Sequence, residues 1–146
     1  MSLRYLPIFL FLLMSLSCGS KSTDLNLSMA NTQNPLPACP DSPNCVLTER
    51  EYEFEALVIY NAFREVLTDI ASETPSTKNQ ELKIDAVFNI PVFGWKDDVV
   101  IQLATQKNKT IAYIRSASRE GYSDLGVNKR RVKKILSKVD LKLQSK

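Results

Sequence analysis

Apolar residues recur at every second position from Leu82 to Ile90, and this alternation restricts the fold more than any other feature of the chain. The alternating set is Leu82, Ile84, Ala86, Phe88 and Ile90. Successive side chains of a strand point to opposite faces of a sheet, so the pattern predicts a half-buried strand. Two more strands are predicted at 99–104 and 110–115, and the tight polar turn between them predicts an antiparallel hairpin.

Two amphipathic segments flank these strands. Apolar residues recur at steps of three and four over 55–71, which predicts a helix with one buried face. The same spacing from Val132 to Leu143 predicts a second helix, and Asn128 is the expected N-cap of that helix. The stretches 39–48 and 73–80 are predicted as loops. The order α-β-β-β-α predicts a two-layer α+β domain, with both helices on one antiparallel sheet of three strands or slightly more.

The N-terminal residues have the three parts of a secretory signal peptide. Arg4 precedes an apolar run from Leu6 to Leu16, and small residues follow up to Cys18. A small residue directly before Cys18 also predicts lipidation of that cysteine, and ordinary cleavage nearby is the alternative. We therefore expect a signal peptide at 1–17, a flexible tether at 18–37 and a single domain at 38–146. The expected location is the cell envelope, with the protein anchored to a membrane by its lipid.

The remaining cysteines, Cys39 and Cys45, are expected to form a disulfide. Export places them in an oxidising environment, and Pro40 and Pro43 stiffen the residues between them. The alternative is a metal site. Because the chain contains no histidine, two cysteines cannot complete the usual ligand set of a structural zinc ion.

The absence of histidine also limits the chemistry of an enzyme. A Ser-His-Asp triad is excluded, so that an enzyme would depend on carboxylates, lysine, tyrosine or a bound cation. The net charge of +3 is small, although the segment from Lys129 onward is strongly basic. A basic helix can bind nucleic acid or anionic lipid, and export argues against nucleic acid. The alternative is an ordinary solvated helix face.

The connection from Arg115 to Arg131 is the densest polar segment, and it joins a predicted strand to the last predicted helix. Its arginines, hydroxyl groups and glycines, together with the start of a helix, favour anion binding. The candidate residues are Arg115, Ser116, Ser118, Arg119, Tyr122, Asp124, Asn128 and Arg131. We expect Arg115, Arg119 and Arg131 to converge, with Asp124 orienting at least one of them. The alternative is a structural brace in which Asp124 is the anion that the arginines hold.

Two further groups of residues lie near these charges. Asp97 and Asp98 could hold a hard cation, but neighbours on a strand point to opposite faces, so we expect neither a metal site nor a cofactor. One aspartate would then face solvent and the other would meet an arginine. Four aromatic residues are candidates for lining an apolar pocket, and core packing is the alternative for them. They are Phe93, Trp95, Tyr113 and Tyr122.

Three motifs together resemble the family called domain of unknown function 1499. They are C-P-D-S-P-N-C at Cys39–Cys45, the Asp97-Asp98 pair and the Arg115–Arg131 connection. The resemblance spans roughly Pro37 to Leu143 and implies no activity, because the family has none established.

We therefore expect a membrane-anchored lipoprotein whose domain binds an anionic small molecule, a lipid head group or a protein partner. One alternative is an enzyme in which Asp97 or Asp98 is the base and Arg115 and Arg119 stabilise negative charge. A purely structural domain is the other alternative.

Overall fold

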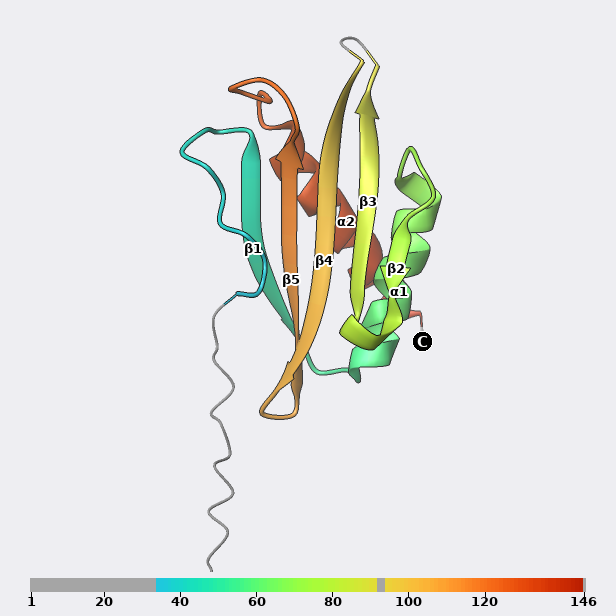
Figure 1. Ribbon diagram of the computed structural model, residues 1–146. Coiled ribbons are helices and arrows are strands. Elements are labelled where there is room, and N and C mark those ends of the chain that lie inside the picture. The colour runs from blue at the N-terminus through green and yellow to red at the C-terminus, as the bar shows by residue number, and fades with distance from the viewer. Residues whose placement is uncertain (1–33, 92–93, 146) are drawn as a thin grey trace, which may run out of the picture.

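The segments predicted as strands form the centre of a larger antiparallel sheet in the computed structural model, which describes residues 34–91 and 94–145 (Figure 1). Within this part of the chain the sheet has five strands in the order β1-β5-β4-β3-β2. The strands are β1 (Cys45–Tyr52), β2 (Ser76–Lys78), β3 (Lys83–Ile90), β4 (Trp95–Gln106) and β5 (Lys109–Ser118). The predicted signal peptide, Cys18 and most of the predicted tether lie outside the described residues.

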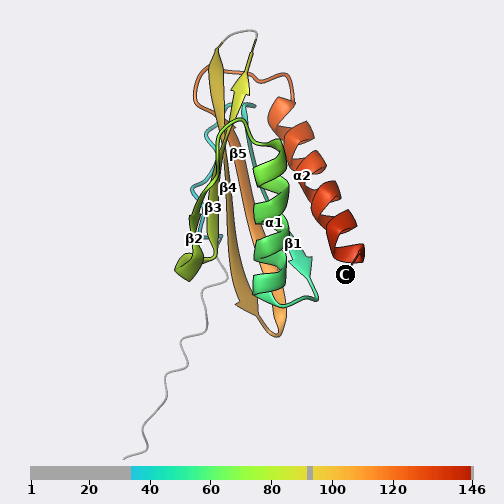
Figure 2. The same cartoon turned by 90° about the vertical axis from the view of Figure 1, so that its right-hand side faces the viewer.

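Both predicted helices are confirmed, and they cover the same face of the sheet (Figure 2). They are α1 (Ala56–Ile70) and α2 (Val127–Gln144). The α+β class is confirmed, whereas the order α-β-β-β-α is wrong because a strand precedes α1 and another precedes β3. The prediction of three strands missed these two, β1 and β2, which form the edges of the sheet.

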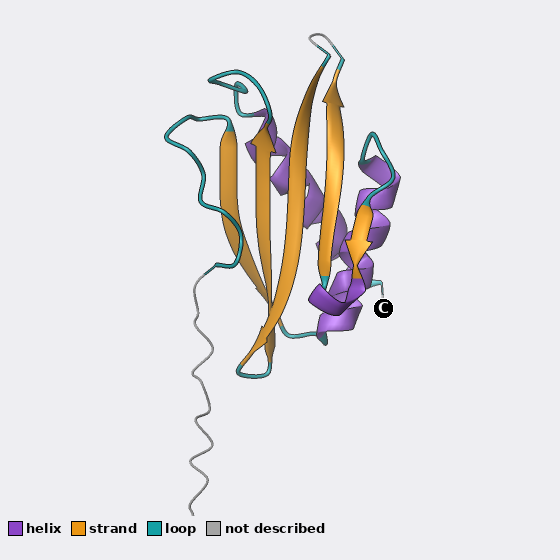
Figure 3. Ribbon diagram, in the orientation of Figure 1, coloured by secondary structure: helices purple, strands orange, loops and turns teal. Residues whose placement is uncertain are grey.

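The two faces of the sheet have different cores. On the helix side, Ile84, Ile101 and Ile114 lie side by side in register and are fully buried with residues of α1 and α2. On the open side, Leu36 packs against Ile111 and Tyr113, so the loop before β1 covers part of the face away from the helices (Figure 3). The packing of the domain therefore extends back at least to Leu36.

The predicted disulfide is confirmed between Cys39 and Cys45, whose Cα atoms are 5.6 Å apart. It closes a small ring that contains Asn44, a buried residue whose partners are distant in the sequence but lie at the same end of the sheet. The side-chain Nδ2 of Asn44 donates to the backbone carbonyl of Gly121, and the backbone carbonyl of Asn44 accepts from the backbone N–H of Ser118. The disulfide thus holds the residue that attaches the start of β1 to the segment after β5.

We expect replacement of both Cys39 and Cys45 by serine to lower the free energy of unfolding by about 2 kcal/mol, because the unfolded chain then regains the freedom that the small ring removes. Guanidinium unfolding followed by circular dichroism measures the loss. Reduction of the wild-type protein should give the same loss, and the double variant should not respond to reductant. Equal stability of the variant and the oxidised protein would contradict this prediction.

Candidate functional site

Asp97 and Asp98 are neighbours on β4, so their side chains point to opposite faces of the sheet. Each aspartate therefore pairs with a different arginine of the Arg115–Arg131 connection. Asp97 lies on the helix side with 1% of its surface exposed, and its Oδ2 accepts a hydrogen bond of 2.6 Å from Nη2 of Arg131. Asp98 lies on the open side, where both its oxygens accept from Arg119 at 2.9 and 2.7 Å. The expected convergence of Arg115, Arg119 and Arg131 is therefore wrong.

The open side brings Arg115 and Arg119 together in one shallow hollow, as the sequence suggested. Glu73, Asp85 and Asp98 line the same hollow, so carboxylates outnumber the two guanidinium groups. Arg119 is an exposed brace for Asp98, whereas Nε of Arg115 is buried and has no hydrogen-bond partner among the described residues. This hollow is not a simple anion site.

Asp124 stabilises the start of α2, and it does not orient an arginine as expected. Its Oδ1 accepts from the N–H of Gly126 at 2.9 Å, and its Oδ2 accepts from the N–H of Asn128 at 2.6 Å. Partial burial raises the pKa of Asp124, but hydrogen bonds from Asn128, Gly126 and its own backbone together outweigh burial, so the pKa lies below its usual value. The N-cap position itself belongs to Gly126, whose φ of 77° suits glycine.

Asn128 is consequently not the N-cap, and it forms the centre of a buried polar network. It is fully buried in the first turn of α2. Its Oδ1 accepts from Ser116 Oγ and, at 2.6 Å, from Nη1 of Arg131. Its Nδ2 donates to the carbonyl of Asn44 and to Ser118 Oγ, both at 3.0 Å. Four predicted site residues therefore lie together here, but they form hydrogen bonds with one another.

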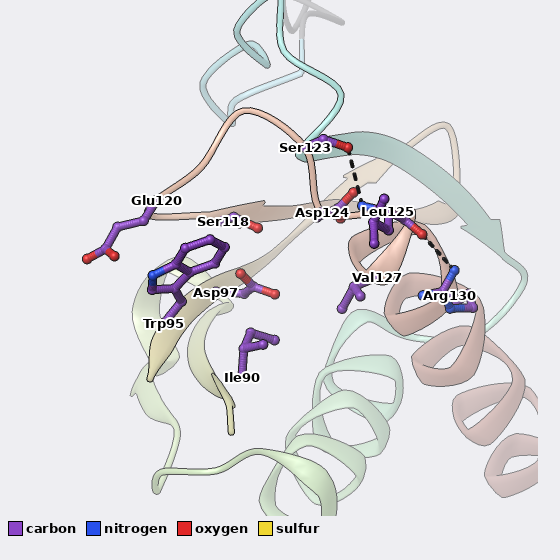
Figure 4. A pocket seen from close by; sticks show the side chains of 10 residues that line it. All are labelled: Ile90, Trp95, Asp97, Ser118, Glu120, Ser123, Asp124, Leu125, Val127 and Arg130. Carbon is purple, nitrogen blue, oxygen red and sulfur yellow. Dashed lines mark hydrogen bonds between the residues drawn. The ribbon is translucent and has the colours of Figure 1, made fainter. Parts of the chain in front are cut away.

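A pocket of about 170 Å³ lies beside this network, between the ends of β3 and β4 and the β5–α2 connection (Figure 4). Ile90, Trp95, Leu125 and Val127 supply apolar walls. The polar lining residues are Asp97, Ser118, Glu120, Ser123, Asp124 and Arg130.

The Asp97 carboxylate points into the space between Trp95, Ile90 and Val127 (Figure 4). Arg131 binds Oδ2, whereas Oδ1 is buried and has no hydrogen-bond partner within the described ranges. A buried acceptor of this kind is uncommon, because leaving it unpaired costs about 1–3 kcal/mol. Asp97 is therefore the most distinctive polar group of the pocket.

Local backbone geometry places Trp95 against the connection. Trp95 lies opposite Ile90 where β3 ends and β4 begins, so both side chains face the same space. Gly121 packs on the indole, because a Cβ at Gly121 would lie 3.4 Å from the ring, and its φ of 81° also suits glycine.

The predicted aromatic pocket is therefore present only in part. Trp95 lines it, Tyr122 is 74% exposed and Tyr113 packs on the opposite face of the sheet. Phe93 lies outside the described residues. Six residues that line the pocket were not among the candidates predicted from the sequence. Five of them belong to the Arg115–Arg131 connection and the sixth ends β3, and only the tertiary fold brings them together. They are Glu120, Ser123, Leu125, Val127, Arg130 and Ile90.

Two further findings concern the described part of the chain. No cluster of three or more Cys, Asp or Glu there could hold a metal ion, and Asp97 and Asp98 point apart. None of its helices has the length and apolar character needed to cross a membrane.

The fold and the site together define a small α+β domain with helices on one face and a partly enclosed pocket at one end of the sheet. The chain belongs to the family described as protein of unknown function (DUF1499), whose family model matches residues 35–139. The match includes every strand and every residue that lines the pocket. A comparison with curated proteins found no match.

Proposed function

We propose that the protein is a lipid-anchored envelope protein whose domain binds a small ligand in the pocket beside Asp97. The observation that supports this proposal is that Asp97 lines the pocket between apolar walls, while its buried Oδ1 has no hydrogen-bond partner among the residues that the structure describes. A ligand that donates a hydrogen bond to Oδ1 removes the cost of an unpaired buried acceptor. Arg131 fixes the other carboxylate oxygen, so the acceptor is oriented before the ligand arrives.

The size of the pocket limits the ligand. Pockets for drug-sized molecules have volumes of about 300–1,000 Å³. This pocket has about 170 Å³ and therefore accepts a small group or one end of a larger molecule. Leu125 is 85% exposed at the mouth, where it offers apolar contact to the part of a ligand that stays outside.

The structure gives less support to the anionic ligand expected from the sequence. Inorganic phosphate on the open face would compete with Asp98 for Arg119 and would lie near Glu73 and Asp85. The hollow keeps one favourable feature, the Nε of Arg115, which has no hydrogen-bond partner within the described part of the chain. Phosphate therefore belongs in the binding experiments as a second candidate, with Arg115→Gln as the variant that removes its donor.

Trp95 is the only tryptophan of the chain, so its fluorescence reports on this pocket directly. We expect the full-length protein in detergent to bind small donor-bearing aromatic compounds, with a change in Trp95 emission and a higher melting temperature. Val127→Phe places a ring at the pocket wall and should abolish the response. Lys138→Phe, on the exposed side of the same helix, is the matched control and should bind normally.

A library that leaves both Trp95 emission and the melting temperature unchanged would contradict the proposal. An equal response of the Val127→Phe and Lys138→Phe variants would also contradict it, because binding would then occur elsewhere.

The lipid anchor is a separate prediction that rests on the apolar run before Ser17, Cys18 and Gly19. We expect Cys18 to be the first residue of the mature protein and to incorporate radiolabelled palmitate. Cys18→Ser should abolish the label, whereas Cys39→Ser should retain it. Firm attachment needs more than one acyl chain, because a single chain binds a membrane only marginally. A mature N-terminus at another residue would rule out this anchor.

A further inference from the structure

We propose that the group bound at Asp97 is a protonated amine carried on a small apolar body. This inference rests on the proposed function, because it specifies the ligand of the same pocket. It is supported by the charge of the lining, the partners of each charged group and the position of Trp95.

Three carboxylates line the pocket, those of Asp97, Glu120 and Asp124, against the single guanidinium of Arg130. Arg130 donates from Nη1 to the carbonyl of Leu125 at 2.9 Å, which ties its cation to the backbone of the connection (Figure 4). The formal charge of the described lining is therefore negative, and it stays negative when Arg131, the partner of Asp97, is counted. A negative pocket attracts a cation and repels an anion.

The partners of the carboxylates identify where a cation binds. Both oxygens of Asp124 accept backbone N–H groups at the start of α2, so that carboxylate is occupied. Glu120 is exposed at the rim and forms no ion pair with the residues that the structure describes. Asp97 Oδ1 is the buried acceptor that remains, and an ammonium N–H gives it a charge-assisted hydrogen bond.

The wall beside Asp97 also suits a cation. Trp95 and Asp97 face the same space (Figure 4), so an ammonium group on Oδ1 lies close to the indole. Indole rings attract cations more strongly than the other aromatic side chains do. Ile90 and Val127 provide the surface for the apolar body. A neutral hydroxyl group would also satisfy Oδ1 but would gain less from the negative lining and the ring.

Three probes with similar apolar bodies test the charge: 2-phenylethylamine, 2-phenylethanol and 3-phenylpropionate, each titrated into the full-length protein and followed by Trp95 fluorescence. We expect the amine to bind at least about fivefold more tightly than the alcohol, because its hydrogen bond is charge-assisted. The carboxylate probe should bind most weakly. Higher salt should weaken the binding of the amine and leave the alcohol unchanged.

Glu120→Gln tests the rim charge without disturbing the buried network. It should weaken amine binding about twofold to fivefold, which is the range for one exposed charge, and should not affect the alcohol. Glu55→Gln, an exposed carboxylate before α1 and outside the pocket, is the matched control and should change neither affinity.

The outcomes separate the two proposals. If the alcohol or the carboxylate probe binds as tightly as the amine, the amine assignment is wrong while the pocket remains a binding site. If neither the three probes nor any compound of the wider library changes Trp95 emission in the wild type, both the proposed function and the amine assignment are wrong. Equal amine binding by the wild type and the Val127→Phe variant places the amine outside the pocket and overturns the assignment.

Discussion

Replacement of Arg131 by methionine is expected to lower the free energy of unfolding by about 3–5 kcal/mol, the largest effect of any single change considered for this domain. The Arg131 and Asp97 side chains are 8% and 2% exposed, and 2.6 Å separates Nη2 from Oδ2. Without Arg131 the Asp97 carboxylate stays buried with no cation beside it. Arg131 also lies over the Phe88 ring at 4.7 Å and donates to Asn128, so methionine replaces only the packing.

The double variant Asp97→Leu/Arg131→Met separates the charge from the packing. Apolar side chains of similar volume often replace a buried ion pair without loss, so we expect the double variant to recover most of the lost stability. Arg130→Met is the matched control on the exposed neighbour, and its stability should stay within about 0.5 kcal/mol of the wild type. If the double variant is as unstable as Arg131→Met alone, the unpaired charge is not the cause. Urea unfolding measures all four proteins.

Replacement of Asn128 by alanine is expected to cost about 2–3 kcal/mol, because it leaves the buried carbonyl of Asn44 without its Asn128 partner and removes an acceptor from Ser116 and Arg131. Asn128 also donates to Ser118 Oγ, so its loss should loosen the wall of the pocket as well. Thermal and denaturant unfolding measure the stability, and Trp95 emission in the folded state reports on the pocket.

Asn128→Asp separates the role of the amide oxygen of Asn128 from the role of its amide nitrogen. Aspartate keeps the acceptor for Ser116 and Arg131 but presents an oxygen, in place of Nδ2, to the carbonyl of Asn44. We expect it to be no more stable than the alanine variant, because two acceptors then face each other in a buried site. Lys129→Ala, the exposed neighbour, should have almost wild-type stability. Wild-type stability in Asn128→Ala would mean that the network does not contribute to folding.

The parts of the fold that follow from local patterns were predicted correctly. The segment that alternates from Leu82 to Ile90 corresponds to β3. The predicted hairpin is formed by β4 and β5, and both strands are longer than predicted. Both helices follow from apolar residues at steps of three and four, since each helix buries a single face on the sheet. These elements lie at the centre of the domain, where burial imposes the periodicity.

The two edge strands could not be predicted in this way. β1 has the sequence CVLTEREY, and the consecutive charged residues Glu49, Arg50 and Glu51 interrupt any alternation. β2 is three exposed residues long. Edge strands are often short or charged, which prevents pairing with other chains, and the same property removes the pattern by which strands are recognised.

Four of the candidate site residues lie together, although the residues that they contact were not predicted. Ser116, Ser118, Asn128 and Arg131 do form one cluster. Their other partners, Asn44 and Asp97, come from segments far away in the sequence. Proximity in sequence suggested Asp124 as the partner of the arginines, whereas the sheet supplied Asp97 and Asp98 on opposite faces. Only the tertiary fold determines which charges meet.

The bond between Asn44 and Asn128 has a consequence for the order in which the domain assembles. These residues are 84 positions apart, and they join the start of β1 to the first turn of α2. Contacts of such long range form slowly, because a long loop must close before they contribute. During synthesis Asn44 emerges well before α2, so the carbonyl of Asn44 has no Asn128 partner until α2 has also been made. A nascent chain can therefore form the central hairpin well before it can form the pocket.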